Sequence, residues 1–95
     1  MMKRILLTAL LIGIAALPAQ AACYADYKAK QDNPLRLHYG VVQVSDSACA
    51  SGAAAAEVAA KIGRDGWILL NVLSVFGPEG LDQRRESAGA YYLRY

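Results

Sequence analysis

The sequence predicts a small α+β domain: a four-stranded, mainly antiparallel sheet with one helix packed on one face, in the order β-β-α-β-β. Three observations lead to this fold class. Two stretches that alternate polar and apolar residues come first, an alanine-rich stretch with helical periodicity follows, and two further strand-like stretches end the chain. The domain is predicted to span residues 22–95, after a cleaved signal peptide at residues 1–21.

The first 21 residues have the three parts of a secretory signal peptide. Lys3 and Arg4 form a basic start, residues 5–17 are apolar, and Ala-Gln-Ala at residues 19–21 matches the small-x-small pattern of a cleavage site. The apolar stretch is shorter than the roughly 18 residues that a membrane span needs. We therefore expect cleavage, export to the periplasm or the outside of the cell, and no retained membrane span.

Removing residues 1–21 from the 95-residue chain leaves 74 residues, which is enough for one domain. The whole chain has 10 Lys and Arg and 8 Asp and Glu. Because two of the basic residues are removed with the signal peptide, the mature part has 8 basic and 8 acidic residues. Without a charge excess or a basic stripe, nucleic acid is not expected as a partner.

The two cysteines, Cys23 and Cys49, both lie in the exported part, where oxidising conditions favour a disulfide. Closing a loop of roughly 25 residues stabilises a fold by about 3–4 kcal/mol in the chain-entropy model. Two alternatives compete with this pairing. Cys23 is a candidate for lipidation, although Gln20 is unlike the large aliphatic residue of lipoprotein signals, and Cys49 is a candidate nucleophile at a helix start, with His38 as its partner.

Residues 23–30 alternate polar and apolar side chains, as a strand with one buried face does. Asn33-Pro34 marks a turn, and the Val-, Leu- and Tyr-rich residues 35–44 are predicted to be the second strand of a hairpin. Gly40 in the middle of that strand indicates a bulge or the close approach of a bulky group.

A helix is predicted over residues 48–64, after candidate capping residues at 45–47. Charged residues lie on one side of it, and Gly66 is expected to end it in the left-handed conformation. The apolar stripe at helical spacing is Ala55, Val58, Ala59 and Ile62.

Residues 67–75 are apolar on both faces, so they are predicted to form a strand inside the sheet. One helix covers only one face, and the other is expected to bind a partner or a second copy of the chain, or to be shielded by residues 76–89 with Phe76 and Leu81 as anchors. That 14-residue connection is expected to be a long loop. Residues 90–95 alternate again and are predicted to be the last strand.

Two short motifs stand out in the second half of the chain: Gly-Arg-Asp-Gly-Trp at residues 63–67, where the predicted helix meets the next strand, and Tyr-Tyr-Leu-Arg at residues 91–94, within the predicted last strand. With the apolar strand between them, they resemble the small bacterial domain of unknown function 4177, and the likeness covers residues 41–95. The chain departs from the usual cytoplasmic members in its export, its cysteine pair and its added first strand. The resemblance implies one helix on an antiparallel sheet, and no catalytic residue or known activity.

Patterns for catalysis and metal binding are absent from the sequence. His38 is the only histidine, it has no Cys-x-x-Cys, His-x-His or clustered acidic motif beside it, and no nucleotide-binding fingerprint occurs. The carboxylates Glu79, Asp82 and Glu86 are expected to be solvated loop residues. We therefore expect no metal, no cofactor and no enzymatic activity.

The expected function is that of a non-enzymatic exported domain that binds a protein or serves as an accessory of an envelope complex. The alternative is a small-ligand-binding or enzyme-inhibiting protein whose loop at residues 76–89 enters a partner's cleft. Aromatic rings and an arginine pair supply the contacts in either case. The candidate interaction residues are Trp67, Leu81, Arg84, Arg85 and Tyr92.

Overall fold

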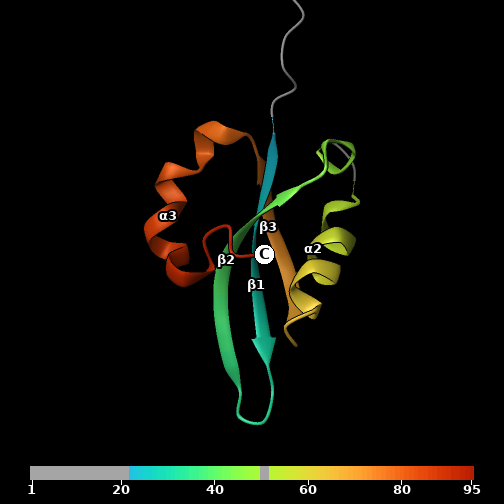
Figure 1. The fold of residues 1–95 in the computed structure, drawn as a ribbon, viewed down its shortest axis with the longest axis vertical. Helices are drawn as coiled ribbons and strands as arrows, with labels where there is room; N and C mark the ends of the chain where they lie inside the picture. The colour runs from blue at the N-terminus through green and yellow to red at the C-terminus, as the bar shows by residue number, and fades with distance from the viewer. Residues whose placement is uncertain (1–21, 50–51) are drawn as a thin grey trace, which may run out of the picture.

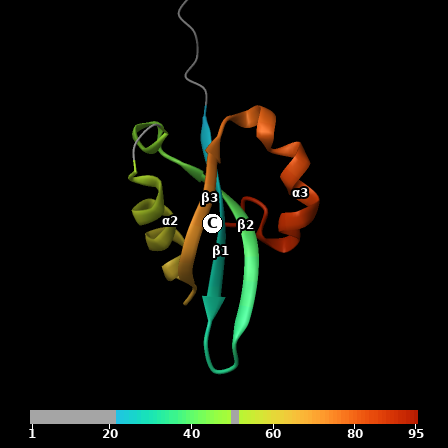
Figure 2. The ribbon, with the colours of Figure 1, turned by 180° about the vertical axis from the view of Figure 1, so that it is seen from behind.

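The computed structural model describes residues 22–49 and 52–95, which have an α+β fold. The predicted signal peptide at residues 1–21 lies outside the described residues. Two helices lie on opposite sides of the sheet (Figures 1 and 2). The sheet consists of β1 (Cys23–Gln31), β2 (Arg36–Val44) and β3 (Ile68–Phe76), and the helices are α2 (Ala54–Gly63) and α3 (Asp82–Ala88). Short 3-10 turns lie at Asp46–Ala48, Pro78–Gly80 and Gly89–Tyr91.

β1 and β2 form the predicted antiparallel hairpin, whose pairing runs without interruption from Cys23 opposite Val44 to Gln31 opposite Arg36. The turn falls at Asn33, as predicted, and Asn33 has a positive φ of 63°. Gly40 lies opposite Tyr27 and provides the close approach that the sequence indicated, because the Tyr27 ring lies over it.

The strand order is β2-β1-β3, with β3 paired antiparallel to β1. The prediction that residues 67–75 lie inside the sheet is therefore wrong, because β1 is the central strand and β3 is an edge. β3 is apolar on both faces although only one face is covered. That face packs against α2, while Ile68, Leu70 and Leu73 of this strand stay exposed.

The core lies between the sheet and α2. The helix is shorter than the predicted 48–64, since it begins at Ala54 and ends at Gly63, and residue 48 belongs to the 3-10 turn at Asp46–Ala48. Val58 and Ile62 of the predicted stripe are buried, as predicted. Ala55 and Ala59 are exposed, and Ala54 is buried in their place, so the buried line runs from Ala54 through Val58 and Ile62. The buried residues of this core are Cys23, Ala25, Tyr27, Ala29, Val42, Val44, Ala48, Ala54, Val58, Ile62 and Trp67.

The chain after β3 departs most from the sequence-based expectation. Residues 76–89 do not form a loop but a 3-10 turn and α3, and residues 90–95 do not form a fourth strand. The last residues make only an isolated bridge between Val41 and Tyr92, and the Leu93 amide donates to the Val41 carbonyl at 2.8 Å. Leu93 then takes a positive φ of 55°, which ends any extended conformation there.

The predicted disulfide between Cys23 and Cys49 is present, with 5.7 Å between the two Cα atoms. It joins the start of the central strand to the segment that leads into α2. Such a bond is compatible with an exported protein.

The fit of Tyr27 over Gly40 leads to a stability prediction. An alanine Cβ at position 40 would lie 2.5 Å from the hydroxyl oxygen of Tyr27, whose side chain is fully buried and has no room to move. We expect Gly40→Ala to lower the free energy of unfolding by about 1–3 kcal/mol, as overpacking does.

Gly63→Ala is the matched control, because nothing lies within 4 Å of a Cβ at that exposed helical position. It should leave stability unchanged or raise it slightly. Urea denaturation of both variants measures the difference. A Gly40→Ala variant as stable as the wild type would contradict the packing described here.

Candidate functional site

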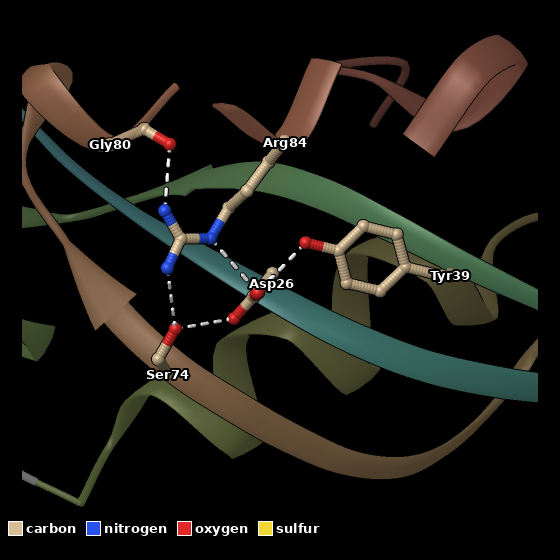
Figure 3. Close-up of polar contacts among 5 residues, drawn as sticks. All are labelled: Asp26, Tyr39, Ser74, Gly80 and Arg84. Atoms are coloured by element: carbon tan, nitrogen blue, oxygen red, sulfur yellow. Dashed lines mark hydrogen bonds and ion pairs between the residues drawn. The ribbon is translucent and has the colours of Figure 1, made fainter. Parts of the chain in front are cut away.

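α3 is held on the sheet by a buried carboxylate, Asp26 of β1, on the face opposite α2 (Figure 3). Only 6% of Asp26 is exposed. Its Oδ2 accepts hydrogen bonds from the Tyr39 hydroxyl at 2.8 Å and from Arg84 Nε at 3.0 Å, and its Oδ1 accepts one from Ser74 Oγ at 2.6 Å. These donors come from β2, α3 and β3, so one carboxylate connects three elements to the central strand.

Arg84 is itself fixed on all sides. Its Nη1 donates to the Gly80 carbonyl at 2.7 Å and its Nη2 to Ser74 Oγ at 3.4 Å. The guanidinium carbon lies 3.9 Å from the centre of the Phe76 ring, within the range of a cation–π contact. This one side chain therefore determines where α3 sits on the sheet.

The protonation of this cluster follows from its contacts. Burial opposes the ionisation of Asp26, but the hydrogen bonds from Ser74, Tyr39 and Arg84, together with the Arg84 charge, outweigh it and hold its pKa below the usual value. Burial and the adjacent Asp26 carboxylate raise the pKa of Tyr39 to about 12. At neutral pH the cluster is thus an ionised Asp–Arg pair with a neutral tyrosine.

α3 leaves part of this sheet face open. Beyond Asp26, toward the β1–β2 turn, lies a hollow of about 330 Å³. It is lined by Lys28, Ala29, Leu37, His38, Tyr39 and Leu70. Leu37 and Leu70 are 65% and 50% exposed. In the described part of the chain, Lys28 has no ion-pair or hydrogen-bond partner for its side chain. The hollow is therefore an apolar depression with one free cation beside it.

Tyr39 connects the hollow to the Asp26 cluster, because its hydroxyl bonds Asp26 while its ring lines the hollow. The Tyr39 ring, one wall of the hollow, is thus held in place through its bond to Asp26. A side chain that is already positioned loses less conformational freedom when a ligand binds beside it.

The single histidine has a packing environment rather than a catalytic one. The His38 ring stacks on Tyr91 with 3.7 Å between centroids, and its Nε2 is hydrogen-bonded to the Tyr27 hydroxyl at 2.9 Å. Burial lowers the pKa of His38, and the Arg94 charge lowers it further. Among residues 22–49 and 52–95, no group of three His, Cys, Asp or Glu residues is placed to hold a metal ion.

The sequence-predicted interaction residues fall in separate places. Trp67 is buried in the core, 4.2 Å from His38 between ring centroids, and Arg84 is the anchor of α3. Leu81 is half-buried at the start of α3. Arg85 and Tyr92 lie together, with 5.2 Å between the guanidinium and the ring centre. These five residues do not form one surface.

The structure adds three residues that the sequence reasoning did not single out as a site: Asp26, Lys28 and Leu37. The only signal available was that Asp26 and Lys28 fall on the polar side of the first predicted strand. That pattern is the usual one for a solvated face, so it does not distinguish a buried anchor from exposed charge.

No family model, curated protein or solved structure matches the chain. The resemblance to the domain of unknown function 4177 thus stays a prediction. None of the described helices has both the length and the apolar character needed to span a membrane.

The lowered pKa of Asp26 predicts an acid-sensitive fold. A carboxyl group whose pKa is lower in the folded state stabilises the protein above its unfolded pKa, close to 3.8, and this stabilisation is lost as the pH falls through the folded pKa. We expect Asp26→Asn to cost about 1.5–3 kcal/mol at pH 7, because Arg84 loses its charged acceptor.

The difference between wild type and Asp26→Asn should begin to shrink below about pH 4, where the carboxyl group of the unfolded chain takes up its proton, and should be smallest below the lower pKa of the folded protein. Thermal unfolding of both proteins from pH 2 to pH 7 measures this. Asp82→Asn, on the exposed side of α3, is the control and should behave as the wild type at pH 7. A constant difference across the whole range would contradict the assigned role of the Asp26 charge.

Proposed function

We propose that this chain is a non-enzymatic exported domain that binds another protein through the hollow beside Lys28. The observation that carries the proposal is an apolar depression with exposed leucines and a free ammonium group on the half of the sheet face that α3 leaves uncovered. Apolar patches of this kind on small proteins are often sites of protein binding.

The expected partner presents an apolar side chain next to a carboxylate. Leu37 and Leu70 supply the apolar contact, while Lys28 supplies the charge that the carboxylate would meet. A charge at the rim of such a contact contributes more to orientation and to the rate of association than to affinity. The hollow is small, so we expect a short segment of the partner to enter it.

The alternative, in which residues 76–89 enter the cleft of an enzyme, requires a rearrangement of the fold or a contact through the outer side of α3 alone. This segment forms α3 and is packed on the sheet, with Arg84 held by Asp26. It would have to leave that position, or to act through its outer side alone. The hollow requires no such rearrangement, and we therefore favour it.

The test compares two leucines with almost the same exposure, 65% for Leu37 and 64% for Leu35. Only Leu37 lines the hollow. A photo-crosslinking amino acid is placed at each position in cells that produce the protein. We expect position 37 to give a discrete adduct with one protein, and position 35 to give none.

With that protein purified, Leu37→Asp should weaken binding at least tenfold, and Leu35→Asp should leave it unchanged. Lys28→Glu should weaken it chiefly through slower association, with a reduced dependence on salt. Equal effects of the two leucine variants would contradict the proposal, and so would an adduct that contains only two copies of this chain.

A further inference from the structure

The two edges of the sheet are protected very differently. At the β2 edge, Tyr92 bridges to Val41 and the Leu93 amide donates to the Val41 carbonyl, so the end of the chain covers part of that edge. At the β3 edge, no strand in the described part of the chain pairs with the outer side of Ile68–Phe76. An open edge of this length presents a row of main-chain donors and acceptors to any strand that meets it.

β3 lacks the usual features that keep edge strands apart. Its nine residues, Ile-Leu-Leu-Asn-Val-Leu-Ser-Val-Phe, include no charged residue and no proline. Two irregularities interrupt its pairing with β1, and a bulge can blunt an edge. Here, however, the two residues left without a partner are Leu70 and Leu73, which are 50% and 45% exposed. The bulges add apolar surface to the edge and no charge.

The side of α2 above this edge carries two alanines, Ala55 and Ala59, which we call the alanine flank. The other side of the helix points toward β2 and the residue after it, where Glu57 accepts from the Ser45 amide at 2.8 Å and Lys61 donates to the Gln43 carbonyl at 2.5 Å. An α-helix turns about 100° per residue, so Ala55 and Ala59 lie on the other side of the buried line, above the β3 edge. Both are exposed.

We propose that two copies of this chain pair through their β3 edges, with the α2 helices side by side on one face of a continuous six-stranded sheet. Antiparallel pairing of identical strands is isologous and places both helices on the same face, related by a two-fold axis. The uncharged strand pairs with its own copy without repulsion between like charges.

The alanine flank is what favours a second copy over a foreign strand. α2 packs chiefly on β3, so pairing at that edge brings the two helices close together across the two-fold axis. Interaxial distances of about 8–10 Å are set by the side chains at the contact, and small ones permit the closer approach. A foreign strand added to β3 would bring no second helix and would need no such flank.

Leu70 belongs both to the β3 edge and to the hollow, so the interface is tested at Leu73 and Ala59, which do not line the hollow. The experiment is sedimentation equilibrium of the oxidised, processed protein purified from the cells that produce it, across a concentration series up to 1 mM. We expect a reversible monomer–dimer equilibrium. Leu73→Lys and Ala59→Glu should each raise the dissociation constant at least tenfold.

Two controls keep the result specific. Ala60→Glu adds the same charge to the outer side of α2, and Leu37→Asp alters the hollow, so neither should change the dissociation constant. Circular dichroism confirms that each variant is folded, and Ala59→Glu keeps the test decisive if Leu73→Lys does not fold. A wild type that stays monomeric at every concentration would overturn the proposal, as would equal effects of Ala59→Glu and Ala60→Glu.

Discussion

Asp26 lies on the central strand with only 6% of its surface exposed, and a carboxylate in that position is costly unless donors surround it. The chain supplies them from β2, β3 and α3. Because Arg84 is one of the three, α3 has to lie over this end of the sheet and no other. The position of α3 in turn decides which half of the face stays open, so the hollow beside Lys28 is a consequence of where one carboxylate is buried.

The second constraint is the small size of the domain. One face of the sheet is covered by α2 and by an aromatic cluster in which His38 contacts the rings of Tyr27, Trp67 and Tyr91. For the other face the chain supplies a helix of only seven residues, α3. Large apolar residues of β3 and β2 are left at the surface as a result. These are the residues that form the hollow and the β3 edge, and the proposed binding and self-association both use surface that the fold is too small to bury.

The aromatic cluster shows how the last residues of the chain become part of the structure without forming a strand. Tyr91 stacks on His38, and the Tyr95 hydroxyl donates to Asp65 at 2.7 Å. The segment thus passes from α3, around the β2 edge, to the side of the sheet that carries α2. Side-chain contacts with rings from β1 and β2 replace the ladder of main-chain hydrogen bonds that a strand would have made.

The sequence by itself determined the α+β class, the hairpin and the end of α2, and it favoured the pairing of Cys23 with Cys49 over two alternatives, because periodicity, turn residues and a count of two cysteines are local or nearly local properties. The start of α2 was predicted six residues too early. The strand order, the fold of residues 76–89 and the open half of the sheet were decided only by the tertiary structure. Arg84 contacts Asp26 across 58 positions of sequence, and no local sequence pattern around either residue predicts this contact. The apolar residues on both faces of β3 were equally ambiguous. Burial between two layers and exposure at an edge leave the same pattern in the sequence, and only the placement of β1 between its neighbours distinguishes them.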